Sequence, residues 1–327
     1  MKFQKILLSC SIALFCSLSF AQSWPERPVK IVIGLPPGGG GDTAARIIAN
    51  ELEKQLGQPF VVENKPGAGG IIASQSLARA KPDGYNILMV TDFYAINAAL
   101  NDEDLLQTSL PYDTFSDFRA VGRIVNMQIM LMASSKFPAK TLKEIIATAK
   151  NNPGEVTAAH LGLASPHYVA MRLLQNRSET SFLEVPYQGS GPATTALMSG
   201  EVNLAFTGVG AGMQLASSER ANAIAVSGPK RDPLAPEVPT IAESGYPGYS
   251  VLSWMGLLAP AKTPDDIVTK LNQALNTVLH DSAVIEKLQA AGLQAAPSSP
   301  TEFMNVIRED SKNMREIFRS ANIKLKE

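Results

Sequence analysis

Cysteine is nearly absent from this sequence: only two occur in 327 residues, and both lie close to the amino terminus. They fall in a largely apolar stretch, 6–20, that follows Lys2 and Lys5. A positive start, an apolar middle and small residues before the cut are typical of an export signal. We therefore predict a signal peptide over residues 1–21, cleaved after Ala21. The mature chain then has no cysteine, which excludes disulfides, thiolate nucleophiles and cysteine-bound metals.

A strong charge of either sign is also missing. Removing Lys2 and Lys5 from the 29 basic residues leaves 27 against 30 acidic ones, a balance of about −3. No later segment is long and apolar enough to span a membrane, and no basic cluster suits nucleic acid or a lipid surface. We expect a soluble exported protein with no nucleic-acid partner. The sequence Leu7-Leu8-Ser9-Cys10 leaves a lipid anchor as the alternative.

Catalytic patterns are equally scarce. The three histidines, His160, His167 and His280, lack the spacing of a metal site. There is no Gly-x-Ser-x-Gly elbow, no Ser-His-Asp signature and no redox group. We predict no metal, no cofactor and no enzymatic activity. A hydrolase or isomerase that uses Asp42 or His167 stays open as an alternative.

What the sequence does contain is an alternation of strand-like and helical runs, which predicts parallel sheets covered by helices. The expected strands are 29–35, 60–63, 86–90, 121–124, 129–133, 156–159, 184–187, 203–206 and 223–226. The expected helices are 43–56, 70–80, 142–150, 166–174 and 192–199, with two more after the start signals Thr263-Pro-Asp-Asp266 and Ser299-Pro-Thr-Glu302.

About 306 mature residues exceed what one hydrophobic core usually holds, so we predict two α/β lobes. The first lobe comprises 22–133 and 223–327, and the second comprises 134–222. Two crossings near 129–134 and 223–227 form the expected hinge. Ligands favour the carboxyl ends of parallel strands and the clefts between domains, so we expect the site between the lobes.

Four consecutive glycines follow the first expected strand. Glycine lets the backbone approach a ligand closely, and the start of a helix offers unpaired N–H groups that suit an anion. Neither nucleotide-binding pattern is present, because the loop lacks the Gly-Lys-Ser/Thr ending and the Gly-x-Gly-x-x-Gly spacing. We interpret the loop as one wall of a site for a small acid, with Asp42 either capping the next helix or facing the ligand. The candidate residues here are Leu35, Pro36, Gly38, Gly39, Gly40 and Asp42.

Further candidate contacts follow other expected strands. In the first lobe, Tyr94 can equally belong to the core, and the loop 66–70 can be a simple tight turn. In the second lobe, a hydrogen-bonding or buried role for His167 is favoured over that of a catalytic base, because no nucleophile accompanies it. The candidates are Thr91, Tyr94 and Asn97 in the first lobe, and Ser165, His167, Tyr187, Gly189, Asn203 and Thr207 in the second.

Seven motifs occur in order along nearly the whole mature chain: Trp24-Pro-x-Arg-Pro28, Pro36-x-Gly-Gly-x-x-Asp42-x-x-Ala-Arg46, Val62-Glu-Asn-Lys-Pro-Gly-Ala-Gly-Gly70, Pro82-Asp-Gly-Tyr85, Val185-Pro-Tyr-x-Gly189, Val238-Pro-Thr-x-x-Glu-x-Gly245 and Trp254-x-Gly-Leu-x-Ala-Pro260. In this order they resemble the periplasmic solute-binding proteins of tripartite tricarboxylate transporters, also called Bug proteins. The resemblance implies a type II periplasmic binding-protein fold whose lobes close over a di- or tricarboxylate, or over an aromatic carboxylate. It places one carboxylate on residues 35–42, with the loops around Thr91, Ser165, Tyr187 and Thr207 supplying the remaining contacts.

The same resemblance implies a periplasmic location and delivery of the ligand to membrane subunits of the transporter, and we expect the protein to be a monomer. A subunit that presents its ligand to a membrane sensor kinase is the alternative. The chain departs from the family where Gln188 replaces a frequent Lys, Asn203 a frequent Asp and Ala164 a frequent Gly. Loss of the acid at 203 argues against ligands with a cationic amine, and Phe93 with Tyr94 suggests an aromatic or apolar ligand body.

Overall fold

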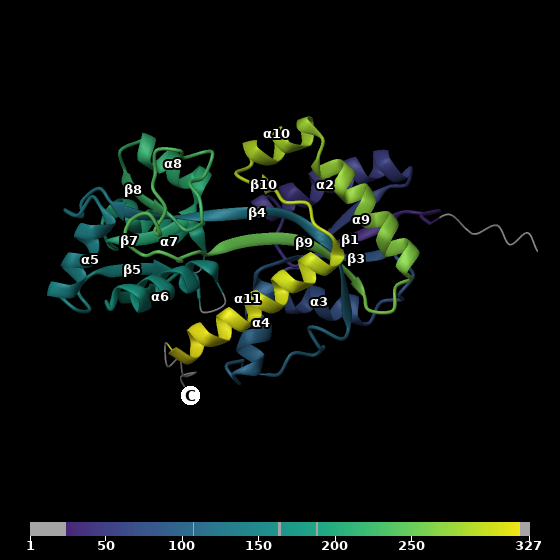
Figure 1. Ribbon diagram of the computed structural model, residues 1–327, viewed down its shortest axis with the longest axis horizontal. Coiled ribbons are helices and arrows are strands. Elements are labelled where there is room, and N and C mark those ends of the chain that lie inside the picture. Colours follow the sequence, from purple (N-terminus) through teal and green to yellow (C-terminus); the bar gives the residue numbers. More distant parts are fainter. Residues whose placement is uncertain (1–23, 107, 163–164, 188, 321–327) are drawn as a thin grey trace, which may run out of the picture.

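The structure is a computed structural model that describes residues 24–320 apart from 107, 163–164 and 188, so the predicted signal peptide lies outside it. Helices and strands alternate as the sequence predicts (Figure 1). The strands are β1 (Val29–Ile33), β2 (Phe60–Asn64), β3 (Asn86–Thr91), β4 (Phe118–Ser134), β5 (Thr157–His160), β6 (Leu183–Pro186), β7 (Leu204–Gly208), β8 (Ala221–Val226), β9 (Leu252–Pro260) and β10 (Gln294–Ala295). The helices are α2 (Gly40–Leu56), η2 (Ala68–Gly70), α3 (Ile71–Ala78), α4 (Phe93–Asp102), α5 (Leu142–Asn151), α6 (Pro166–Ser178), α7 (Ser190–Ser199), α8 (Val209–Ser217), α9 (Asp265–Leu279), α10 (Ser282–Ala290) and α11 (Pro300–Ser320).

Two sheets share the long strand β4. In the first sheet, β1 pairs in parallel with β2 and β3, and β9 pairs antiparallel with both β3 and β4. In the second sheet, β5 pairs in parallel with β6 and β7, while β7 and β8 run antiparallel to β4. Figure 1 shows β4 and β9 running between the two lobes, with α5 to α8 around the second sheet. The fold is therefore two α/β lobes, as predicted.

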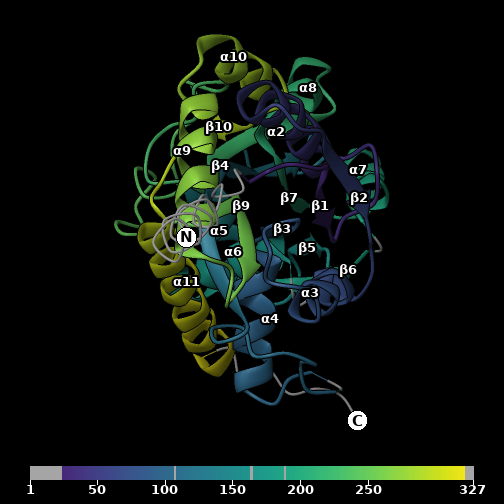
Figure 2. The same ribbon diagram turned by 90° about the vertical axis from the view of Figure 1, so that its right-hand side faces the viewer.

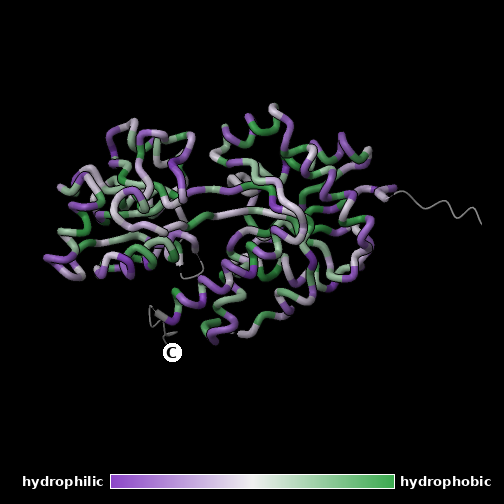
Figure 3. The backbone as a smooth tube through the Cα atoms, in the orientation of Figure 1, coloured by the Kyte–Doolittle hydropathy of each residue, from purple (hydrophilic) through white to green (hydrophobic). Residues whose placement is uncertain are grey.

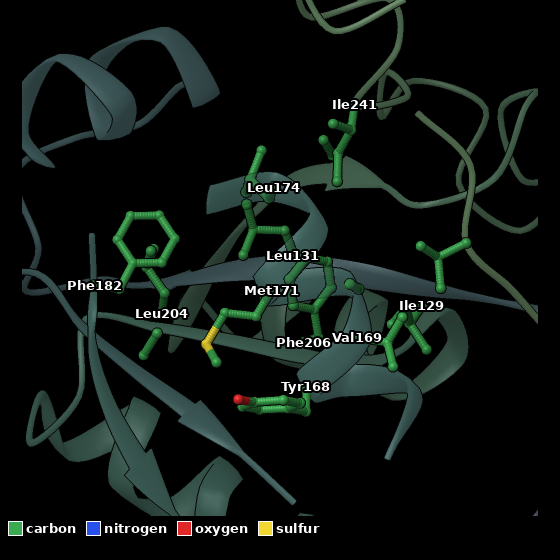
Figure 4. Packing of buried hydrophobic residues seen from close by; sticks show 14 of the residues in the cluster. Ile129, Leu131, Tyr168, Val169, Met171, Leu174, Phe182, Leu204, Phe206 and Ile241 are labelled. Carbon is green, nitrogen blue, oxygen red and sulfur yellow. The ribbon is translucent and has the colours of Figure 1, made fainter. Parts of the chain in front are cut away.

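Each sheet is covered on both faces, which explains why its strands read as apolar runs. On the first sheet, α2, α9 and α10 cover one face and α3, α4 and α11 cover the other (Figure 2). On the second sheet, α5 and α6 cover one face and α7 and α8 the other. Figure 3 shows the same pattern as apolar segments inside both lobes and polar ones outside. In Figure 4, Ile129 and Leu131 of β4 pack among side chains of α6 and β7.

The structure differs from the prediction at the crossings. The two strands expected at 121–124 and 129–133 form the single strand β4, because the pairing with β9 ends at Gln128 and the pairing with β7 begins at the next residue, Ile129. The second crossing between the lobes was predicted near 223–227. These residues lie in or next to β8, which pairs with the part of β4 that belongs to the second sheet. The chain after β8 also stays with this lobe, since Ile241 and Tyr249 pack in its core. We therefore place the return crossing at the start of β9.

Sequence reasoning missed several elements. It did not anticipate β9, α4, α8 or α10, and it placed the cap of α9 at Thr263, whereas α9 has Pro264 as its N-cap. The start of α11 was predicted correctly: Ser299 and Glu302 form the expected reciprocal hydrogen bonds. No helix in the described part of the chain is both long and apolar enough to cross a membrane.

Candidate functional site

A cavity of about 750 Å³ opens between the lobes. Its walls come from segments that are far apart in the sequence but meet where the strands end. The first lobe contributes the β1–α2 and β3–α4 connections and the α10–β10 turn. The second lobe contributes the amino-terminal ends of α6, α7 and α8. Residues 127–129 of β4 and Ser253 and Met255 of β9 line it from the crossing strands. The cavity therefore lies at the predicted place, between the lobes.

Three helices that begin at this cleft share an unusual start. The N-cap residues of α2, α7 and α8 are Gly39, Gly189 and Gly208, and none of the three provides a side-chain cap. By contrast, Thr141, Ser165 and Asp281 cap α5, α6 and α10 with their own side chains. The first N–H groups of a helix have no partner within the helix, so a glycine cap leaves them available to a ligand. The cleft is bordered by such starts in both lobes.

In the first lobe, hydrogen bonds to the Asp42 side chain hold the glycine loop in place. Its carboxylate accepts hydrogen bonds from the Gly38 amide (3.0 Å), from Arg46 Nε (2.9 Å) and from Asn64 Nδ2 (2.9 Å). Asn64 Nδ2 also donates to the Leu35 carbonyl at 3.0 Å, so one side chain contacts both ends of the loop. Asp42 thus stabilises the loop, and its carboxylate oxygens accept hydrogen bonds from groups of the protein itself.

The electrostatics of Asp42 agree with this role. The hydrogen bond from Arg46 is the main cause that lowers the pKa of Asp42 to about 2, and those from Gly38 and Asn64 act in the same direction. The carboxylate therefore stays ionised at any physiological pH. The predicted helix cap is wrong in detail: Gly39 is the N-cap of α2, and Asp42 lies inside the first turn.

In the second lobe, α8 presents Gly208, Val209 and Gly210 to the cleft, and α7 presents Ser190. The ring of His167, at the start of α6, also lines the cavity, and its Nδ1 is a buried atom without a hydrogen-bond partner in the described structure. Burial lowers the pKa of His167 to about 4, so the imidazole is neutral near pH 7. A neutral imidazole can donate one hydrogen bond but brings no charge.

Asp92 is the one carboxylate among the described residues that line the cleft, and none of these residues is Lys or Arg. Its side chain is only 6% exposed and accepts a hydrogen bond from the Phe93 amide. Burial raises the pKa of Asp92 to about 7, and the neighbouring Asp310 acts in the same direction. Asp92 also lines a second cavity of about 400 Å³, bounded by α4, α6 and α11. It therefore forms part of the wall between the two cavities.

The structure brings some of the predicted site residues to the cleft. Leu35, Gly40, Thr91 and His167 line it. Pro36, Gly38 and Gly39 lie exposed in the loop before α2, and Gly189, Ser165 and Thr207 sit next to lining residues. Ser165 itself is committed as the cap of α6, since its hydroxyl accepts from the Tyr168 amide and donates to the Gly162 carbonyl.

Four other predicted residues have structural partners away from the cavity. Tyr94 is buried and donates to the Thr114 carbonyl at 2.7 Å, while Asn97 donates to the Gly69 carbonyl at 2.9 Å. Tyr187 donates to Glu201 at 2.9 Å. Asn203 lies just before β7, and its Oδ1 accepts from Thr157 on β5. None of the four belongs to the lining of the cleft.

These placements change two arguments made from the sequence. The residue at 203 holds two strands together, so its identity says nothing about a ligand amine. Of the two aromatic residues expected near the ligand, Phe93 lines the cleft and Tyr94 does not. Gln188 and Ala164 lie outside the described residues.

Sequence reasoning also missed part of the site. Sequence reasoning reached the end of β7 at Thr207 but did not extend the site into α8, although Gly208 at the end of this strand and Gly210 just after it form a glycine-rich connection like the first one. The residues on the α10–β10 turn and Gln128 on β4 carry no such pattern, since only the tertiary fold brings them to the cleft.

Two α/β lobes on a shared strand, with the cavity between them, define a type II periplasmic binding protein. Solved structures agree: R. palustris Rpa4515 with adipate is 30% identical, with a TM-score of 0.80 over 92% of this chain and 99% of that chain. MatC from Rhodopseudomonas palustris with bound malate is 32% identical, with a TM-score of 0.75 over 90% of this chain and 99% of that one.

The family follows from the sequence itself. A family model described as "Tripartite tricarboxylate transporter family receptor" matches residues 44–323. Protein BugT from Bordetella pertussis is 32% identical over 306 residues, which cover 94% of this chain and 93% of BugT. The chain therefore belongs to the tripartite tricarboxylate transporter receptors of the Bug type, as the motif order predicted.

Proposed function

We propose that the protein captures a small organic dicarboxylate between its lobes and delivers it to membrane subunits of a tripartite tricarboxylate transporter. One observation carries the proposal: uncapped, glycine-started helices border the cleft from both lobes. α2 supplies one group of backbone N–H donors, and α7 with α8 supplies the other. A ligand with a carboxylate at each end satisfies both groups at once.

The composition of the cleft favours backbone donors over side-chain charge. No Lys or Arg lies among its described lining residues, so none of them can give a ligand carboxylate a charge-assisted hydrogen bond from a guanidinium or ammonium group. A helix start stabilises a nearby anion by roughly 0.3–1 kcal/mol, and by up to about 2 kcal/mol where it is partly buried. Three such starts acting together can hold two carboxylates without a basic residue.

Several apolar side chains line the cleft. Phe93, Met127 and Met255 line it from the first lobe and the crossing, and Val209 and Met213 from the second lobe. Apolar surroundings stabilise methylene groups by about 0.8 kcal/mol for each one buried. We therefore expect an acid with methylene groups between its carboxylates. Relatives of known structure that hold adipate and malate support the dicarboxylate class.

Location and partners are part of the same proposal. A signal peptide over residues 1–21 would export the chain to the periplasm, where it acts as a monomer. Membership of the receptor family supports transfer of the ligand to the membrane subunits of the transporter. We propose a binding role without turnover, which membership of the receptor family supports.

Calorimetric titration of the mature protein, after unfolding and refolding to remove bound ligand, tests the function. Adipate should bind more tightly than malate. Hexanoate, which matches adipate in length but lacks the second carboxylate, should lose at least tenfold in affinity. A dicarboxylate at one hundred times its dissociation constant should stabilise the fold by about 2.7 kcal/mol. Equal affinity for hexanoate and adipate would contradict the two-ended site.

A further inference from the structure

The two sheets meet between Gln128 and Ile129 of β4. Gln128 is the last residue of β4 opposite β9, where it faces Leu252, and Ile129 is the first residue opposite β7, where it faces Gly208. Any movement of one lobe against the other must therefore change the backbone near this pair. Gln128 also lines the ligand cleft, so its side chain lies at the pivot and at the cavity together.

One end of the Gln128 side chain is fixed by the hinge. Its Oε1 accepts a hydrogen bond from the Gly228 amide at 3.0 Å. Because an amide N–H can only donate, the Gln128 oxygen must face Gly228, and this assigns the orientation of the side-chain amide. A Cβ on residue 228 would lie 2.3 Å from Oε1, so any larger residue there would displace the end of the Gln128 side chain.

Hydrogen bonds near this contact connect three segments of the chain where the lobes meet. Ser227 donates its amide to the Ile129 carbonyl (2.8 Å) and its hydroxyl to the Val251 carbonyl (2.6 Å). The Ile129 amide donates to the Ser227 hydroxyl in return (3.1 Å). These bonds hold together β4, the segment after β8 and the residues just before β9. Gln128 is hydrogen-bonded to the segment after β8, through Gly228.

The other end of the side chain has no partner. Gln128 is 7% exposed, and in the described part of the chain its Nε2 makes no hydrogen bond. This nitrogen is not fully buried, and Gln128 is one of the residues that line the cleft. An oriented amide with unpaired N–H donors, on a residue that lines the proposed ligand cleft, is suited to bind an oxygen of the ligand.

We propose that Gln128 binds the ligand through Nε2 and the hinge through Oε1, and so makes lobe closure respond to the presence of a carboxylate. This inference rests on the proposed dicarboxylate function. It adds a contact at the pivot to those supplied by the helix starts. A ligand bound to Nε2 polarises the amide and strengthens the bond from Gly228, which draws the crossing strands toward the occupied arrangement.

Three variants separate the two bonds. Gln128→Met keeps the size of the side chain and removes both bonds. Gln128→Glu keeps an acceptor for Gly228 but loses the donor. Gly228→Ala leaves Gln128 in the sequence and displaces its amide through the added Cβ. Gln289 provides the matched control, because it lines the same cleft from α10 without touching the hinge, and Gln289→Met and Gln289→Glu repeat the chemical changes there.

The readouts are the affinity for adipate and for malate by calorimetry, the Tm of the ligand-free protein, and the ligand-induced compaction by X-ray scattering. Loss of a hydrogen bond to a charged group should weaken Gln128→Met by roughly 10- to 100-fold. Gln289→Met should lose less affinity than Gln128→Met, because it changes the cleft lining without removing a hinge bond. Gln128→Glu should bind more weakly than Gln289→Glu and lose the compaction, and its Tm should fall because the new carboxyl stands at a side chain that is only 7% exposed. Gly228→Ala should weaken binding at least tenfold without itself lining the cleft.

Two results overturn the inference. Affinity of Gln128→Glu equal to that of Gln289→Glu would show that only the added charge matters, and it decides the question even where Gln128→Met fails to fold. Wild-type affinity in Gly228→Ala would show that the orientation of Gln128 is irrelevant. Both outcomes leave the proposed function intact. A wild-type protein that binds neither adipate nor malate overturns the proposed function, and the inference falls with it.

Discussion

Asp92 carries a buried carboxyl with no salt bridge in the described structure, and replacing it with Asn should stabilise the ligand-free protein at neutral pH. The side chain is 6% exposed and lies between two cavities. Burial raises its pKa from 3.8 to about 7. Asn has nearly the same shape, and its oxygen can still accept the hydrogen bond from the Phe93 amide. The substitution thus removes the ionisation, and the other contact that it alters is the hydrogen bond between Ser253 and the Asp92 carboxyl.

The sign of the effect follows from proton linkage. A carboxyl whose pKa is higher in the folded protein than in the unfolded chain keeps its proton longer when folded. Its contribution to stability is greatest below about pH 4, declines as the pH rises to about 7 and is constant above. At about 1.4 kcal/mol for each pH unit, the gap from 3.8 to about 7 corresponds to about 4 kcal/mol. Water in the two cavities reduces this, so we expect about 2–4 kcal/mol.

Scanning calorimetry of the ligand-free protein at pH 4.5 and pH 8 measures the effect. Asp92→Asn should match wild type at pH 4.5 within about 1 kcal/mol and exceed it by about 2–4 kcal/mol at pH 8, or roughly 4–8 °C in Tm. Asp266→Asn, an exposed acid in the first turn of α9, is the control and should change Tm slightly and equally at both pH values. A stability gain in Asp92→Asn that does not depend on pH would refute the reasoning.

Three shorter predictions concern the cleft and the hinge. Gly40→Val should weaken dicarboxylate binding at least tenfold while the Tm falls by no more than a few degrees, because a Cβ there has open space; equal losses of both would mark the loop as structural. Ser227→Ala should cost about 1–3 kcal/mol in chemical unfolding, since its buried hydroxyl joins Ile129 to Val251; an unchanged midpoint would speak against a hinge bond. The His167 imidazole should titrate near pH 4 by NMR, and a midpoint above 6 would place a charge in the cleft.

Much of the fold could be predicted because local patterns dominate it. The apolar run 29–35 predicts a strand, and the amphipathic pattern after Gly39 predicts a helix. β1 and α2 lie close to these predicted positions. The strand β9 could not be recognised in the same way, because Ser253, Trp254 and Gly256 interrupt its pattern. Its place is set by pairing with β3 and β4, which lie far away in the sequence.

The site was predicted less well than the fold, for a related reason. A glycine loop after a strand is a local feature, and Gly40 does line the cleft. Polar residues near strand ends are ambiguous, because the same groups can satisfy the backbone: Asn97 binds the Gly69 carbonyl, and Asn203 binds Thr157. Gln128 stands inside an apolar strand, where nothing in the sequence marks it as a cleft residue.

The continuity of β4 restricts how this chain can evolve. Beyond the junction its side chains alternate between two separate cores: Ile129, Leu131 and Ala133 face one, and Met130 and Met132 face the other. Side chains of a strand repeat every two residues, so inserting or deleting one residue there would exchange the two sets along the rest of the strand. In each core, a small side chain in place of a large one would leave a void, and a large one in place of a small one would clash with its neighbours. Beyond the junction, divergence along this strand is therefore open to substitution, whereas changes of length are accommodated better in the loops.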